Sequence, residues 1–285
     1  MRSYIDCVYC YLKQVVICME NAEIDEDVQY EVLYNLMDYI KSFDKNDTPA
    51  ENSTRAILKA YEMIGVNDPY ERAKKESNDA ALLLYPKLKN IVENSNDSLY
   101  KALKIAVAGN IIDLGINRDY DINKALHHSL EVGFAKDDYI LFEEKLRNVR
   151  EVLFLGDNAG EIVFDKILVE EMIKREKKVV YAVKEGPILN DATIHDAAYV
   201  GMDRIAEIIT TGSNYLGVSV NQSSPDFLEK LRSAELVLSK GQANFESLEG
   251  KDLTAAKVFF LLKIKCEGVG RVAQAEFGDI VFIAG

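Results

Sequence analysis

Several features that mark particular protein classes are scarce or missing. The 285-residue sequence has only five prolines and no low-complexity tract, and with 48% hydrophobic and 28% charged residues its composition is globular. A chain of this length can bury a large core. No stretch reaches the roughly 18 apolar residues of a membrane helix. Asp6, Lys13 and Glu20 interrupt the short apolar run near the start, so we expect neither a membrane span nor a signal peptide.

An excess of positive charge is also missing. The formal net charge is −13, which argues against a nucleic-acid partner because phosphate binding along a duplex needs clustered lysines and arginines. A small anionic ligand remains possible, since a bound divalent cation reverses the local field. The four cysteines stand in a sequence without secretory features, so free thiols or a metal site are expected rather than disulfides. We therefore expect a cytoplasmic protein.

The two halves of the chain have different patterns. Residues 1–147 read as helices, with Asp68 followed by Pro69 as one predicted helix start. From residue 148 onward, short apolar runs alternate with amphipathic segments. The expected strands are 152–155, 179–183, 207–210, 236–238, 258–262 and 280–283. This pattern predicts a three-layer α/β/α sandwich with a mostly parallel sheet at 148–285, preceded by a helical region at 1–147.

Polar residues follow four of these strands, at 156–161, 184–191, 211–214 and 240–246. Ligands of parallel α/β sheets bind beyond the carboxyl ends of the strands. Asp157 and Asn158 follow the first strand, Asp191 comes after the second, and Lys240 comes after the fourth. Carboxylate and amide oxygens suit Mg²⁺, Mn²⁺ or a similar ion. The sequence therefore predicts a divalent-metal site at this edge.

Two other interpretations apply to the loop at 156–161. Asp157 could simply cap the following helix, since aspartate and asparagine are favoured at that position. The loop could also be a nucleotide or S-adenosylmethionine loop, but Asp157 and Asn158 stand where close backbone approach would need glycine. The polar residues after the neighbouring strands favour a metal site over both.

At these residues the chain resembles the damage-control phosphatase family, formerly a domain of unknown function. The matching segments are 156–165 (Gly-Asp-Asn-Ala-Gly-Glu-Ile-Val-Phe-Asp), 187–193 (Pro-Ile-Leu-Asn-Asp-Ala-Thr) and 240–246 (Lys-Gly-Gln-Ala-Asn-Phe-Glu), with weaker matches at 68–70, 108–113 and 265–266. They occur in order across nearly the whole chain. The Cys-x-x-Cys at 7–10 resembles a stand-alone subgroup of the family.

The resemblance implies a metal-dependent phosphatase with the α/β/α fold and a helical N-terminal region. It implies that Asp157, Asn158 and Asp191 form the catalytic centre and hold a divalent ion such as Mn²⁺, Co²⁺, Ni²⁺ or Mg²⁺. It also implies that Glu161 and Lys240 contact the substrate and its phosphate.

Other candidates for substrate binding rest on weaker signals. Asn110 and Asp113 are three residues apart, so they share a helix face and either line the pocket or form a polar helix end. Gly212 and Ser213 form either a phosphate-binding backbone nest or an ordinary turn. Asn244 belongs to the third matching segment.

Most of the cysteines and histidines are expected to be structural. Cys7, Cys10 and Cys18 share one helical face. They could bind a metal or form a redox pair, but without a second Cys-x-x-Cys we expect buried thiols, and Cys266 is expected in the core. His195, one helical turn after Asp191, could approach the site, whereas the adjacent pair at 127–128 is expected on the surface or in helix packing.

We therefore expect a phosphatase acting on small phosphorylated sugars or damaged metabolites, with no nucleic-acid or membrane partner. An S-adenosylmethionine-dependent carboxyl methyltransferase and a non-catalytic metal- or phosphometabolite-binding protein are the alternatives. The sequence leaves two nucleophiles open: a metal-bound water, or Asp157 forming an aspartyl-phosphate. It does not predict the oligomeric state.

Overall fold

A seven-stranded sheet is the centre of the molecule in the computed structural model, which describes residues 1–109 and 133–285. The strand order is β1-β7-β6-β5-β2-β3-β4, and β7 runs antiparallel to β6 while every other pairing is parallel. The strands are β1 (Lys136–Asp137), β2 (Glu151–Leu155), β3 (Lys178–Val183), β4 (Glu207–Thr210), β5 (Leu236–Lys240), β6 (Lys257–Lys263) and β7 (Ile280–Ala284).

All six predicted strands are present. Strands of a sheet that is covered on both faces are apolar along their whole length, so short apolar runs identify them. One correction concerns the first half of the chain, for which the sequence predicted no strand. β1 comes from that half and pairs with β7, and its two polar residues carry no strand pattern. The division into regions at residue 147 stays a prediction.

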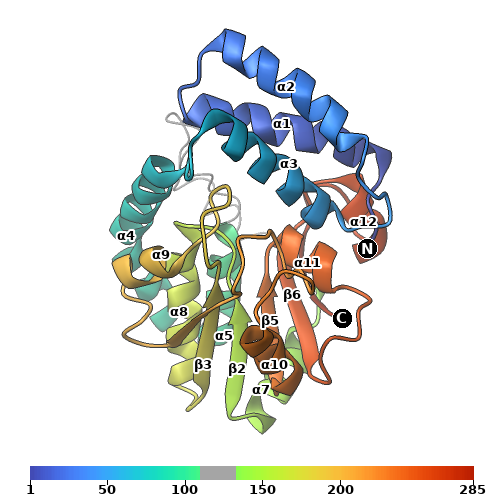
Figure 1. Ribbon diagram of the computed structural model, residues 1–285. Helices are drawn as coiled ribbons and strands as arrows, with labels where there is room; N and C mark the ends of the chain where they lie inside the picture. Colours follow the sequence, from blue (N-terminus) through green and yellow to red (C-terminus); the bar gives the residue numbers. More distant parts are fainter. Residues whose placement is uncertain (110–132) are drawn as a thin grey trace.

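Helices cover both faces of the sheet, as Figure 1 shows. Successive strand residues point to opposite faces, so Val152 and Phe154 belong to one core and Leu153 and Leu155 to the other. The first face carries α5 (Ser98–Ala108), α7 (Tyr139–Asn148), α8 (Glu161–Ile173) and α9 (Ile194–Tyr199). The second carries α10 (Pro225–Ser233), α11 (Gln242–Leu248) and α12 (Glu267–Ala273). The predicted three-layer α/β fold is confirmed.

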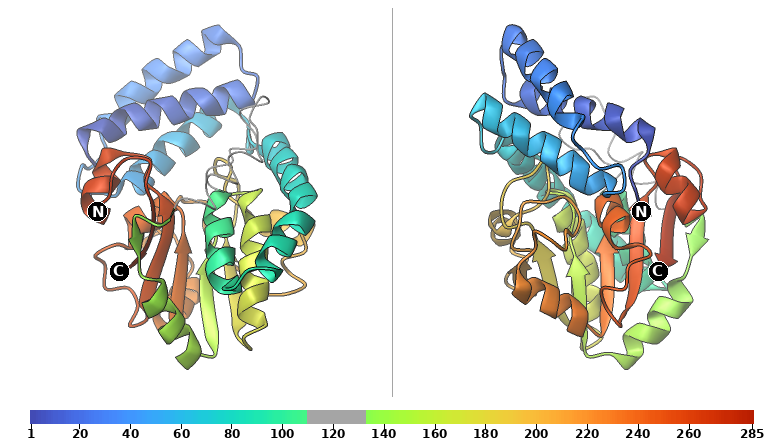
Figure 2. Two further views of the ribbon diagram at one scale, coloured as in Figure 1. Left: turned by 180° about the vertical axis from the view of Figure 1, so that it is seen from behind. Right: turned by 45° about the vertical axis from the view of Figure 1, so that its right-hand side comes forward.

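The first three of the N-terminal helices form a separate layer over one end of the sheet, and the fourth packs against α8. They are α1 (Ile5–Asn21), α2 (Glu26–Ile40), α3 (Pro49–Ile64) and α4 (Glu71–Glu93). Figures 1 and 2 show α1, α2 and α3 crossing that end, while α4 descends beside α8. The first three share a third core that includes Val15, Leu36 and Ile57. The helical N-terminal region is thereby confirmed.

One predicted helix start is shifted. Asp68 does not cap a helix beginning at Pro69; its Oδ1 accepts a hydrogen bond from Tyr70 N at 3.0 Å in a turn, and α4 begins at Glu71. No helix in the described part of the chain is long and apolar enough to cross a membrane.

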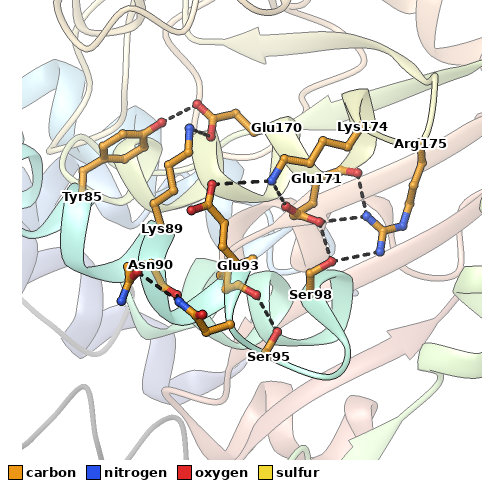
Figure 3. A network of polar contacts seen from close by, with 12 residues as sticks. Tyr85, Lys89, Asn90, Glu93, Ser95, Ser98, Glu170, Glu171, Lys174 and Arg175 are labelled. Carbon is orange, nitrogen blue, oxygen red and sulfur yellow. Dashed lines mark hydrogen bonds and ion pairs between the residues drawn. The ribbon is translucent and has the colours of Figure 1, made fainter.

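Helix α8 is fixed at its far end by a polar network, drawn in Figure 3. The buried Glu171 accepts from Ser98 Oγ at 2.6 Å and from Arg175 Nη1 at 2.9 Å, and Lys89 Nζ on α4 pairs with Glu170 at 2.8 Å. Burial would raise the pKa of Glu171, but Lys174, Ser98 and Arg175 lower it below its ordinary value, so the carboxylate stays charged. Polar contacts thus link helices α4, α5 and α8 at this end.

Candidate active site

The strand order reverses between β2 and β5: β3 and β4 lie on one side, β5 and β6 on the other. Such a switch point opens a crevice at the carboxyl ends of the strands. Gly241, directly after β5, comes so close to the loop after β2 that a Cβ built on it would lie 2.0 Å from Asp157 Oδ2. The fold therefore places Asp157 at the crevice.

The loops after β2 and β3 are joined by backbone hydrogen bonds. Ala159 N donates to Asn190 O at 2.9 Å, and Ala192 N donates to Asp157 O at 2.8 Å, which makes Asn158 and Asp191 a bridge pair. The structure thus brings together Asp157, Asn158 and Asp191, the three predicted metal ligands. Asp157 does not cap α8, whose N-cap residue is Gly160.

The N-terminal helices hold both loops in place. Leu189 has a φ of 45°, a strained conformation for a residue with a side chain, and its N–H donates to Tyr61 Oη on α3 at 3.1 Å. The buried Asn78 on α4 accepts from Gly160 N at 2.7 Å and donates to Asp196 at 2.8 Å. Sequence reasoning missed Tyr61 and Asn78, because their role depends on contacts between distant segments.

A cavity of about 390 Å³ opens between the N-terminal helices and these loops. Asp157, Asn158 and Asp191 line its floor, with Lys265 beside them. The helices contribute neutral polar and apolar side chains to the walls, among them Tyr11, Gln14, Ile17, Ser53, Tyr70 and Ser77. The predicted ligands and Glu246 are thus the acidic lining residues, and the wall formed by the N-terminal helices suits a neutral organic group.

Two buried carboxylates characterise the floor, with the buried Lys184 beside Asp191. Burial raises the pKa of Asp157 well above its ordinary value, and the charges of Asp191 and Glu161 raise it further. Burial also raises the pKa of Asp191, against the opposing effect of Lys184. Asp191 Oδ2 is buried without a hydrogen-bond partner in the described residues, and Lys184 Nζ is 3.7 Å from it.

These observations fit a divalent cation. A buried acceptor without a donor is costly, and crowded carboxylates are what an added positive charge stabilises. Two carboxylates and one amide are hard oxygen donors of the kind that Mg²⁺ and Mn²⁺ take. Among the described residues no three His, Cys, Asp or Glu side chains converge as a ligand set, so Asn158 would complete the set with an amide oxygen.

Lys240 lies below this floor rather than in the cavity. Its side chain is fully buried, and Nζ bonds Glu161 Oε1, Asp165 Oδ1 at 2.6 Å and the carbonyl of Ala106 at 2.9 Å. An ammonium group has three donors, so all three are used within the protein. Glu161 is also buried and is not among the residues lining the cavity. Substrate contact by Glu161 and Lys240 stays a prediction.

The cation that does line the cavity is Lys265, which sequence reasoning did not select as a site residue. It is the only lysine or arginine among the described lining residues. It is exposed, and its charge lowers the pKa values of both Asp157 and Asp191, against the larger effect of burial. The available signal was the short Lys-Cys match at 265–266.

The weaker candidates in the described part of the chain do not line the cavity. Asn244 is buried and ties the ends of β2 and β5 together, donating to Gly156 O at 3.1 Å and to Lys240 O at 2.8 Å. Gly212 and Ser213 do not line the described cavity, and neither does His195, which is exposed. Asn110 and Asp113, like the histidine pair at 127–128, lie outside the described residues.

The cysteines differ from expectation. Only Cys18 is buried; Cys10 is exposed, and Cys7 and Cys266 are partly exposed. Cys7, Cys10 and Cys266 line the cavity because α1 and the start of α12 form part of its wall. Burial raises the pKa of Cys7 and Cys10. A raised thiol pKa reduces reactivity, which argues against a redox pair.

The family assignment rests on the whole length of the chain. A profile described as the damage-control phosphatase ARMT1-like domain matches residues 3–281. The chain belongs to this family.

Three relatives match nearly the whole chain. A damage-control phosphatase of Pyrococcus horikoshii is 30% identical, with 99% of this chain and 97% of that protein covered. One of Archaeoglobus fulgidus is 31% identical, with 96% of each chain covered. An uncharacterized protein of Methanocaldococcus jannaschii is 34% identical, with coverage of 98% and 94%.

A solved structure supports the same assignment. The crystal structure of a DUF89 family protein from Pyrococcus horikoshii superposes with a TM-score of 0.90 at 29% identity, covering 99% of both chains. The resemblance found in the sequence is therefore confirmed for family and fold. Membership also supports a phosphatase activity over the methyltransferase alternative.

Proposed function

We propose that this chain is a divalent-metal-dependent phosphomonoester hydrolase acting on small phosphorylated metabolites. The observation that carries the proposal is the acidic floor of the cavity. There Asp157, Asn158 and Asp191 meet at the sheet's switch point, and Asp191 Oδ2 is buried with no hydrogen-bond partner among the described residues and with Lys184 Nζ 3.7 Å away. Lys265 is the lining cation beside them.

Asp157, Asn158 and Asp191 would hold the ion in this proposal. When bound, a divalent cation supplies Lewis-acid polarisation of the phosphoryl group and a template for it. The ammonium group of Lys265 offsets the negative charge of the remaining phosphoryl oxygens. Two separate positive charges then face a dianionic phosphate at a site that is otherwise strongly negative.

Hydrolysis needs one proton to be moved. The oxygen of water bonds to phosphorus, the bond from phosphorus to the alkoxide leaving group breaks, and the products are inorganic phosphate and an alcohol. The proton lost by the water ends on the alkoxide, which becomes the alcohol.

The cavity favours a small hydroxylated substrate. Its volume of about 390 Å³ is near the lower end of the range for small-molecule pockets. Hydroxyl and amide groups of Tyr11, Gln14 and Ser53 line the wall contributed by α1 and α3. Such groups can exchange hydrogen bonds with a sugar-like leaving group.

The test is phosphate release by metal-stripped protein. The protein would be given p-nitrophenyl phosphate and a panel of sugar phosphates, with and without Mn²⁺, Co²⁺, Ni²⁺ or Mg²⁺. We expect release only with a metal, and none from Asp157→Ala or Asp191→Ala, both folded by circular dichroism. Absence of metal-dependent release from the wild type would leave a non-catalytic binding protein as the better account.

A trapping experiment separates the two nucleophiles. Direct attack of water on phosphorus forms no phosphoenzyme, whereas attack by Asp157 forms an aspartyl-phosphate that water must then hydrolyse. Acid quenching during turnover of a radiolabelled phosphate ester would capture that acyl phosphate. We expect no labelled protein, and a hydroxylamine-sensitive phosphoryl group on Asp157 would contradict direct attack by water.

A further inference from the structure

A buried charged network lies directly beneath the acidic floor. Lys240 bonds two carboxylates of α8, Glu161 and Asp165, which are four residues apart and therefore on one helix face. Asp165 Oδ2 accepts in turn from Tyr181 Oη on β3 at 2.8 Å. Lys240, Asp165 and Tyr181 are fully buried, and none of them lines the cavity.

Stability alone does not account for such a network. Buried ion pairs cost desolvation, and well-packed apolar residues often replace them without loss of stability. Burial would lower the pKa of Lys240, but Asp165 and Glu161 raise it above its ordinary value, so the group is charged. Lys240 is thus a positive charge held at a fixed position behind the site.

One hydrogen bond of this network reaches a predicted ligand, through the amide of Asn158. Asn158 Nδ2 donates to Glu161 Oε2 at 3.3 Å and to Asp157 Oδ2 at 3.1 Å. Both amide hydrogens thus face carboxylates, and the amide oxygen is left on the other side. An amide can present either its oxygen or its nitrogen to a neighbour, and only the oxygen can bind a cation.

We propose that Glu161, Lys240 and Asp165 are positioning residues that orient the Asn158 side chain with its oxygen toward the cation site. Lys240 holds Glu161 Oε1, which leaves Glu161 Oε2 directed at the Asn158 amide nitrogen. Asp165, itself held by Tyr181, fixes Lys240. This assignment rests on the proposed metal site and gives Lys240 an indirect role in place of phosphate contact.

Mn²⁺ affinity tests this inference without any substrate. Mn²⁺ binding to metal-stripped protein would be measured by titration calorimetry for Glu161→Gln, Asp165→Asn and the double variant. Residues that orient metal ligands typically change affinity by about 10- to 100-fold. We expect a loss of about tenfold for Glu161→Gln and a smaller loss for Asp165→Asn. The double variant should bind no more weakly than Glu161→Gln, because Asp165 acts through Glu161.

Glu171→Gln is the matched control. Glu171 is another buried carboxylate of α8, paired with Arg175 and Lys174 at the far end of the helix. The Glu171→Gln variant should have a lower urea midpoint than the wild type and the same Mn²⁺ affinity. Three outcomes would each overturn the inference. Glu161→Gln and Asp165→Asn could bind Mn²⁺ within twofold of the wild type, their losses of affinity could multiply in the double variant, or the wild type could bind no Mn²⁺. A wild type that binds Mn²⁺ but releases no phosphate would refute the proposed function alone.

Discussion

Gly241→Ala should disable the site from a position that bears no functional group. Gly241 has φ 81° and ψ 162°, a conformation that is almost restricted to glycine. A Cβ there would lie 2.0 Å from Asp157 Oδ2 and 2.3 Å from Asp157 Cγ, whereas real Cβ contacts essentially never fall below 3.0 Å. The Asp157 carboxylate must therefore move by about 1 Å.

Two separate losses follow from this change. Backbone strain of this kind costs about 1–3 kcal/mol, which a domain stable by roughly 5–15 kcal/mol survives. A displacement of about 1 Å in a catalytic group typically costs about 100-fold in rate. We therefore expect folded protein with a lower urea midpoint and about 100-fold lower kcat/KM for p-nitrophenyl phosphate.

Gly250→Ala is the control. Gly250 also has a positive φ, of 67°, but a Cβ there would meet nothing within 4 Å. It should lose about 1–2 kcal/mol of stability through strain alone, with unchanged kcat/KM. Wild-type kcat/KM in Gly241→Ala, with the midpoint lowered, would mean that the position of Asp157 does not matter for turnover, and the site would have to be reassigned.

Three further changes test the charges around the cavity. Burial raises the pKa of Glu246 from 4.5 to about 7, so the folded state holds a proton that the unfolded state has lost, and stability should fall as pH rises from about 4.5 to 7, by about 3 kcal/mol. Asp165 and Asp191 also have raised pKa values, so urea unfolding at pH 5 and pH 7.5 should show a smaller loss of stability in Glu246→Gln than in the wild type, and equal losses in the two would contradict the assignment to Glu246. Lys265→Met should lower kcat/KM at least about tenfold, whereas Lys263→Met, outside the cavity lining, should not; steady-state kinetics that fail to separate the two would remove Lys265 from phosphate binding. Asp191→Asn relieves repulsion with Asp157, so the metal-free variant should melt above the wild type, by about 1 kcal/mol or more in stability, while turnover is lost; a lower melting temperature would count against the electrostatic argument.

The fold was predictable because its signals are local. Short apolar runs located β2 through β7. The two-residue β1 has no such signal, since its pairing with β7 depends on chain segments far apart in sequence. The start of α4 was misplaced because Asp68 forms a turn that resembles a helix cap in sequence.

The site was predictable only in part. Strand order brings the residues after β2, β3 and β5 to one edge, so sequence reasoning could group Asp157, Asn158 and Asp191. It could not tell that Lys240 points into the core while Lys265 lines the cavity, because that depends on side-chain packing. The wall contributed by the N-terminal helices, with Cys10 exposed on α1, likewise depends on tertiary contacts.

Metal stoichiometry measured together with turnover tests the central proposal most directly. Metal-stripped protein would be titrated with Mn²⁺, with bound metal followed by equilibrium dialysis and phosphate release followed in parallel. Phosphate release should rise in proportion to the first bound equivalent and then level off, and Asp191→Asn should neither bind that equivalent nor turn over. Full turnover by stripped protein, or unchanged Mn²⁺ binding by Asp191→Asn, would contradict the assignment of Asp157, Asn158 and Asp191 as a catalytic metal site.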